Sequence, residues 1–147
     1  MRAATADCLA LLEELAIEGT TVTMRVRGSS MLPAIANGAI VRLQPSSEKP
    51  VRLGEVVAIR DSGGMMLCHR VVRVYRRGEQ TWVQTWGDVC PEPDAAVPAS
   101  SVIGIVVATI EDEEEKALAP RPAWRICARY LKRALRRLLS HQSVLEG

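Results

Sequence analysis

The sequence predicts one mainly β domain, compact and mostly antiparallel, with a helix before it and a helix after it. Valine and isoleucine fall mainly between residues 22 and 110, and β-branched residues favour strands. Short apolar runs recur there between breaks rich in Gly, Pro and Ser. No long helical pattern separates these runs, which argues against a parallel sheet. With 147 residues, 48% hydrophobic and 24% charged, the chain has the size of a single globular domain.

An N-terminal helix is expected within residues 1–20. Leucine and isoleucine form a rough apolar stripe over residues 5–18, and Gly19 is the expected stop. Glu13 and Glu14 interrupt the apolar segment, so it is a poor secretory signal. The sequence contains no run of 18 apolar residues of the kind that spans a membrane. We therefore expect a cytoplasmic protein without a transmembrane anchor.

The β domain is placed at residues 21–110 and should contain six strands. Apolar and polar residues alternate from Val22 to Arg27, which is the pattern of a half-buried strand. The predicted strands are residues 22–27, 39–43, 55–60, 65–77, 81–86 and 101–110. The segment GDVCPEPDAAVP (87–98) contains three prolines and is expected to be irregular.

The C-terminal part divides by charge into an acidic linker (111–120), which contains EDEEE, and a basic amphipathic helical tail (121–147). The tail has apolar residues at steps of three and four, namely Trp124, Cys127, Leu131, Leu135 and Leu138. Three interpretations stay open. The helix packs on the domain with a solvated cationic face, or residues 121–140 bind an anionic membrane surface. Nucleic acid is the third and is not favoured, because no recognition motif accompanies the basic residues.

The cysteines indicate neither a metal site nor a redox pair. Cys8, Cys68, Cys90 and Cys127 form no CxxC motif, and their spacing suits no zinc site. We expect buried thiols in a reducing compartment, and neither a metal ion nor another cofactor.

Two adjacent serines, Ser29 and Ser30, lie in a glycine-containing break between two apolar strands. Backbone N–H groups in such a break can form an oxyanion hole. A nucleophilic serine needs a base, and the base is commonly oriented by an acid. His69 lies inside a predicted strand, and Asp88 and Asp94 lie in the irregular segment. The alternative is an ordinary turn, a strand histidine bonded to backbone, and two aspartates that stabilise turns.

Four blocks in order resemble a known superfamily: GSSMLPAIANGAIV, LGEVVAI, CHRVVRV and WGDVCPEPDAAVPASSVIGIVV. They are similar to the blocks of the type I signal peptidases and the LexA-type self-cleaving repressors. In the first block of that superfamily a serine directly precedes a methionine, and a proline follows closely. The matching residues are Gly28, Ser30, Met31 and Pro33. The resemblance places the nucleophile on Ser30 and leaves Ser29 as its neighbour in the turn.

The residue that serves as general base differs between the subtypes of the superfamily. Bacterial signal peptidases and the repressors have lysine in the third block, whereas the endoplasmic-reticulum and archaeal signal peptidases have histidine in an H-R-V sequence. This chain has His69-Arg70-Val71 and so resembles the Ser-His type. In that type the second of two aspartates matches the triad acid, which is Asp94 here, and Asp88 would be supporting. The resemblance implies a serine endopeptidase that cleaves a leader, signal or propeptide from a precursor.

The chain departs from the pattern in three places, and two of them, Ala39 and the missing anchor, favour an alternative. The first block usually ends in Gly-Asp and here ends in Gly38-Ala39. Gly28 stands where some members have a serine that donates to the oxyanion, so the hole would rest mainly on backbone N–H groups. A membrane anchor is expected of signal peptidases and is not predicted here. The alternative is a non-catalytic module that keeps the peptidase fold and binds a peptide or a partner protein.

Overall fold

The computed structural model describes residues 10, 14–15, 18, 20–47 and 49–145. Most of the predicted N-terminal helix (5–18) therefore lies outside the described residues. Ala10, Glu14 and Leu15 are helical. The N–H of Glu18 donates to the carbonyl of Glu14 at 3.1 Å, which is the spacing of one helical turn.

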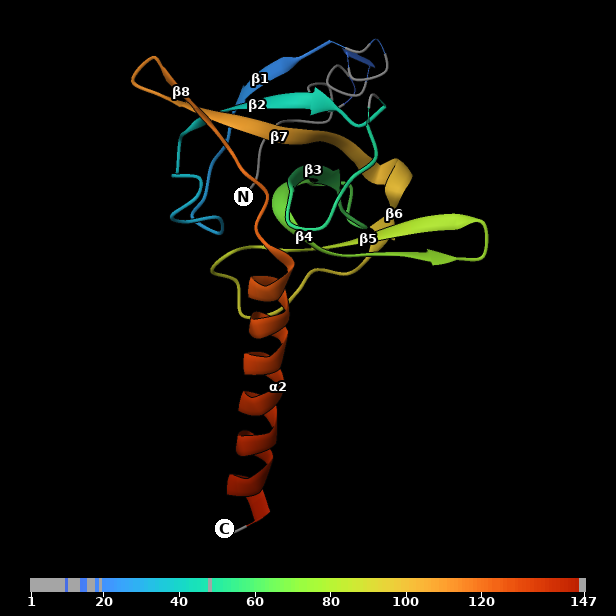
Figure 1. The fold of residues 1–147 in the computed structure, drawn as a ribbon, viewed down its shortest axis with the longest axis vertical. Helices are drawn as coiled ribbons and strands as arrows, with labels where there is room; N and C mark the ends of the chain where they lie inside the picture. The colour runs from blue at the N-terminus through green and yellow to red at the C-terminus, as the bar shows by residue number, and fades with distance from the viewer. Residues whose placement is uncertain (1–9, 11–13, 16–17, 19, 48, 146–147) are drawn as a thin grey trace.

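Eight strands form one sheet within the described part of the chain (Figure 1). They are β1 (Val22–Arg25), β2 (Ile40–Pro45), β3 (Val56–Arg60), β4 (Met66–Arg77), β5 (Gln80–Trp86), β6 (Val97–Pro98), β7 (Val102–Glu111) and β8 (Glu114–Ala117). The order across the sheet is β1-β2-β7-β3-β4-β5-β6, and β8 pairs with β7. Each of these pairings is antiparallel, which confirms the predicted fold class.

Within the predicted acidic linker (111–120) the chain forms a turn and a short strand. Asp112 and Glu113, with φ of 49° and 67°, make a turn, and β8 then returns along β7. β3 pairs with β7 only as far as Val106, and β8 takes the neighbouring position from Ala108 onward. The apolar pattern missed this strand because all four of its residues are exposed, so it carries no buried face.

The sheet curls because its ladders contain register shifts. Such shifts fall between Arg42 and Leu43 in β2, and in the pairings of β3 with β7 and of β4 with β5. One apolar cluster contains buried residues of β2, β3, β4 and β7, together with Met31 and Ile35 of the connection between β1 and β2. A second cluster lies between β3, β4, β5 and β7. Together they make a core of aliphatic side chains, as expected for a chain without phenylalanine.

The basic tail contains one long helix, α2 (Ala123–Leu145), which projects away from the sheet in Figure 1. No described helix is long and apolar enough to cross a membrane. α2 packs on the domain through Ile126, but part of its cationic face is in contact with the domain rather than solvated. Arg129 and Arg133 contact the domain, whereas Leu131 and Leu135 are exposed. The reason is that the domain surface beneath α2 offers carbonyl oxygens and a carboxylate, which pair with guanidinium groups.

Candidate active site

The turn that holds Ser30 is fixed by a hydrogen bond to Asn37 and by two side chains buried in the core. Gly28 has a φ of 105°, a conformation that glycine adopts readily. Its N–H donates to the side-chain oxygen of Asn37 at 2.8 Å. Met31 and Ile35 are fully buried in the core beneath the turn. Ser30 is therefore held half-buried at the edge of the core rather than on a loose loop.

The other predicted residues of this block stay on the outer side of the turn. Ser29 and Pro33 are both exposed. The carbonyl of Ser29 accepts a hydrogen bond from the N–H of Leu32 at 3.2 Å, which closes the turn. Ser29 thus contributes backbone structure, and the two adjacent serines differ in their surroundings.

The structure brings Ser30, His69 and Asp94 into one hydrogen-bonded chain. His69 lies on β4, opposite Val57 of β3, and its side chain is 6% exposed. Its Nε2 is 3.0 Å from Ser30 Oγ. Its Nδ1 is 2.6 Å from Asp94 Oδ2. A hydroxyl, an imidazole and a carboxylate in this sequence can act as nucleophile, general base and orienting acid.

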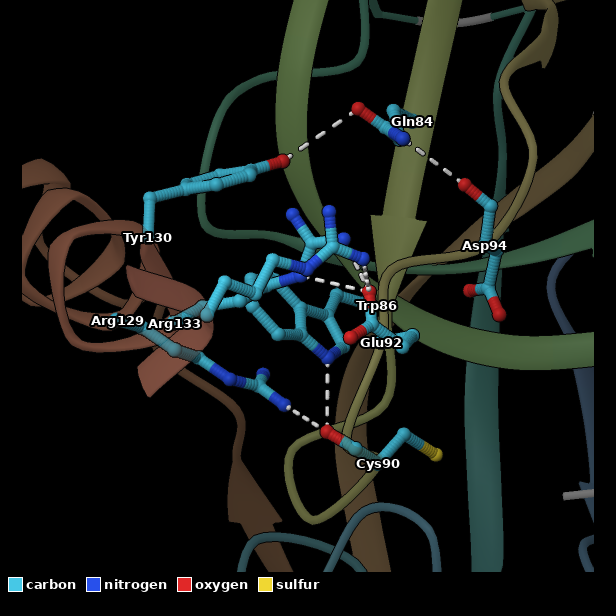
Figure 2. Close-up of polar contacts among 9 residues, drawn as sticks. Gln84, Trp86, Cys90, Glu92, Asp94, Arg129, Tyr130 and Arg133 are labelled. Atoms are coloured by element: carbon cyan, nitrogen blue, oxygen red, sulfur yellow. Dashed lines mark hydrogen bonds and ion pairs between the residues drawn. The ribbon is translucent and has the colours of Figure 1, made fainter. Parts of the chain in front are cut away.

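Asp94 is held by two residues of β5 that the sequence pattern did not single out. Thr85 is buried, and its hydroxyl donates to Asp94 Oδ2 at 2.7 Å. The backbone N–H of Asp94 donates to the carbonyl of Thr85 at 2.9 Å. The Gln84 amide donates to the carbonyl of Asp94 at 3.0 Å, as Figure 2 shows. In the sequence these residues read only as part of a strand, because the fold alone brings Asp94 beside them.

The second candidate acid, Asp88, faces two arginines. Its carboxylate accepts hydrogen bonds from Arg70 Nε at 2.9 Å and Arg70 Nη2 at 2.8 Å, and from Arg121 Nη2 at 2.9 Å. Arg70 also donates to the carbonyl of Gly54 at 2.8 Å. The side chains of Asp88 and Arg70 are 2% and 4% exposed. Asp88 thus joins β4 to the segment that precedes α2, while Asp94 contacts the imidazole.

Gly87 lies directly against the imidazole. A Cβ atom at this position would lie 2.9 Å from His69 Nε2 and 2.6 Å from Cys90 Sγ. Both separations are shorter than real Cβ contacts. Glycine is required here because its backbone approaches the ring closely. Each residue of the Gly-Asp pair in the fourth block thus has a structural role. Gly87 leaves space for the His69 ring, and Asp88 pairs with Arg70.

A model of one protein family matches the sequence over residues 3–107, more than two thirds of the chain; its description is Peptidase S24-like. This chain belongs to the Peptidase S24-like family. The membership supports the wider resemblance to the LexA and signal-peptidase superfamily. The matched range includes Ser30, His69 and Asp94 and ends before α2 begins. No curated protein and no solved structure gave a match.

α2 follows the matched S24-like region in the sequence and forms hydrogen bonds to the loop that carries Asp88 and Asp94. We name residues 87–96, between β5 and β6, the closing loop. Arg129 donates to the carbonyls of Gly87 and Cys90, each at 2.7 Å. Its guanidinium lies 3.8 Å from the centre of the Trp86 ring, and Figure 2 shows its bond to Cys90. The Trp86 indole N–H donates to the same Cys90 carbonyl at 2.8 Å. Burial lowers the pKa of Arg129, and the nearby Asp88 charge opposes this.

Two further residues of α2 extend this contact. The ring of Tyr130 packs edge-on against Trp86 with centroids 5.2 Å apart, and its hydroxyl lies 3.4 Å from Gln84 Oε1. Arg133 donates to the carboxylate of Glu92 in the closing loop, and this bond lowers the pKa of Glu92. The S24-like domain therefore has its closing loop held from the outside by α2.

Three cysteines of the described chain are free thiols. Cys68 precedes His69 and is buried, which raises the pKa of its thiol to about 12. It is therefore protonated at neutral pH and offers no competing thiolate. Within the described residues, no group of three or more His, Cys, Asp or Glu side chains is placed to hold a metal ion.

Replacing Asp88 with alanine is expected to lower the free energy of unfolding by about 3–5 kcal/mol, because the buried Arg70 guanidinium would lose its carboxylate. Urea unfolding followed by circular dichroism measures this. The matched control is Glu115→Ala, which removes an exposed carboxylate 2.7 Å from Arg42 and should leave the midpoint nearly unchanged. A wild-type midpoint for Asp88→Ala would show that the buried pair has no structural role.

Proposed function

We propose that this S24-like protein is a serine endopeptidase of the Ser-His type that uses Ser30, His69 and Asp94. The observation that carries the proposal is the continuous chain of two hydrogen bonds, 3.0 Å and 2.6 Å long, from the hydroxyl through the imidazole to the carboxylate. The family membership supports it, since residues 3–107 include all three groups.

In the proposed reaction, His69 Nε2 takes the proton of Ser30 as the hydroxyl oxygen attacks the scissile carbonyl carbon. The tetrahedral intermediate collapses, the C–N bond breaks, and His69 gives its proton to the leaving amine. The acyl ester on Ser30 is then hydrolysed by a water molecule that His69 deprotonates. Asp94 keeps the proton on Nδ1 and stabilises the imidazolium without taking its proton. Gly28 carries no side-chain donor, so backbone N–H groups of the turn would stabilise the oxyanion.

The position of β1 fits an extended peptide substrate. β1 is at one end of the strand order, and the chain runs from it into the turn that carries Ser30. An extended peptide can add to such an edge as a further strand, with backbone hydrogen bonds for affinity. The scissile bond would then lie near the serine. The proposed substrate is a leader, signal or propeptide of a precursor, as the resemblance implies.

The test is digestion of a proteome-derived peptide library, with new termini identified by mass spectrometry. The wild type and Ser29→Ala should produce the same new termini, and Ser30→Ala should produce none. Ser29 is the matched control because it is the neighbouring serine and is exposed. Equal cleavage by Ser30→Ala would refute the mechanism. Peptide capture without cleavage, by wild type and Ser30→Ala alike, would instead indicate the non-catalytic binding module.

Arg129 is expected to act as a positioning residue for this site. Arg129→Gln would remove two hydrogen bonds to the closing loop, which carries Asp94 and contacts His69. A small displacement of catalytic groups can cost about 10- to 100-fold in kcat. We therefore expect kcat to fall by about this factor, with KM nearly unchanged.

Steady-state kinetics on a library-derived peptide measures the effect of Arg129→Gln. Arg129→Lys keeps the charge without the planar fork and should recover only part of the activity. The control is Lys132→Gln, which removes an exposed charge from the same helix. An unchanged kcat, or a change confined to KM, would show that α2 does not position the site.

A further inference from the structure

α2 presents a row of large apolar side chains to solvent. Trp124, Leu131, Leu135 and Leu138 follow one another at steps of seven, four and three, which places them on one face of a helix. Their exposed fractions are 66%, 63%, 50% and 67%, and the adjacent Leu139 is 66% exposed. We name these five residues the outer stripe. A contiguous apolar surface of this kind marks an interaction site.

The contacts of the opposite face prevent the stripe from turning inward. Ile126 is 3% exposed and packs with Trp86 and Val72. Arg129 bonds two carbonyls of the closing loop. Turning α2 so that the leucines met the domain would break these contacts. The outer stripe is therefore directed away from the domain by the way the helix is docked.

A row of basic residues runs beside the outer stripe. Arg125, Lys132 and Arg136 each directly follow a stripe residue, so they lie about 100° around the helix from it. Between residues 121 and 140 the chain has seven Arg or Lys and no acid. An apolar row beside a basic row is the arrangement of helices that lie in the interface of an anionic membrane. We propose that the outer stripe and this basic row bind α2 to an anionic membrane surface.

The charge pattern favours a lipid surface over a second copy of the chain. Two helices joined along their outer stripes would bring their basic rows near each other, without an acid in residues 121–140 to pair with them. In an anionic membrane the acyl layer would contact the apolar outer stripe, and the headgroups above it would contact the basic row. The stripe from Trp124 to Leu138 is about 21 Å long at about 1.5 Å per residue, so the helix would lie along the surface. α2 projects from the sheet (Figure 1), and each residue of the outer stripe is at least 50% exposed.

Co-sedimentation of the full chain with vesicles tests the proposal. One set of vesicles is phosphatidylcholine alone, and the other contains added phosphatidylglycerol. We expect binding to the anionic vesicles at low salt, weaker binding at high salt, and little binding to the neutral vesicles. The measurement involves no peptide cleavage, so its result is independent of the proposed peptidase activity.

Two double variants separate the two rows. Leu135→Gln with Leu138→Gln should weaken binding by about 100-fold, since each leucine contributes apolar burial. Lys132→Gln with Arg136→Gln should weaken binding to anionic vesicles by about 30-fold. The matched control is Met65→Gln with Val74→Gln, which changes two apolar residues outside α2 that are 40% and 39% exposed. Circular dichroism verifies that each variant keeps its fold.

Four outcomes would overturn the proposal. The first two are that the wild type does not bind anionic vesicles at low salt, and that the leucine variant binds them as tightly as the wild type. The other two are that the control variant loses as much vesicle affinity as the leucine variant, and that the protein binds a DNA duplex but not vesicles. A concentration-dependent dimer in light scattering, lost in the leucine variant and accompanied by no vesicle binding, would assign the outer stripe to a second copy instead.

Discussion

Alanine at Ser30 and alanine at His69 are each expected to lower kcat by about 10⁶-fold, and the double substitution should lower it no further. The reason is that a hydroxyl without its base is a weak nucleophile, and a base without its hydroxyl has no proton to move. The two groups lie 3.0 Å apart and would act as one unit. The measurement is single-turnover and steady-state kinetics of the three variants on one library-derived peptide.

The pattern across these variants is more informative than any single loss. Independent contributions would make the double variant far slower than either single variant, which would contradict a shared step. Ser29→Ala is the control and should keep wild-type kcat. His69→Ala with wild-type kcat would remove the imidazole from the mechanism, whatever the effect at Ser30.

Asparagine at Asp94 is expected to lower kcat by about 10⁴-fold. The carboxylate lies 2.6 Å from His69 Nδ1 and accepts the Thr85 hydroxyl on the same oxygen. An amide of nearly the same shape cannot stabilise the imidazolium, and its N–H₂ favours the tautomer with the proton on Nε2. His69 would then have no free electron pair directed at Ser30. KM should change little, because the lost interaction belongs to the transition state.

Asp88→Asn provides the comparison, since the sequence alone leaves the acid undecided between Asp88 and Asp94. Asp88 contacts arginines rather than the imidazole, so its effect should fall mainly on stability. In conditions where both variants are folded by circular dichroism, we expect Asp88→Asn to keep kcat within about 10-fold of the wild type. A larger loss at Asp88 than at Asp94 would reverse the assignment of the triad acid.

The six predicted strands were found because each has a face that is buried or partly buried, and such burial leaves alternation or an apolar run in the sequence. Val22–Arg25 and Val102–Glu111 are clear cases. β8 left no such pattern, because its residues are exposed and it is held by backbone pairing with β7. β6 has only two residues and is too short for any periodicity. A strand held by its backbone alone is therefore visible only once its neighbour is in place.

The sequence by itself determined the fold class and indicated a helical tail, and the resemblance of its motifs placed the proposed nucleophile and base. Residue order and spacing carry this information, because hydrophobic periodicity and a short motif are local properties. Only the tertiary structure decided which aspartate meets His69, and which face of α2 meets the domain. Asp88 and Asp94 are six residues apart in an irregular loop, so their directions depend on Arg70, Thr85 and the strands that carry them. α2 docks through Arg129 as well as Ile126 because the closing loop presents carbonyl oxygens beside Trp86. No local pattern in the helix records what its partner surface offers.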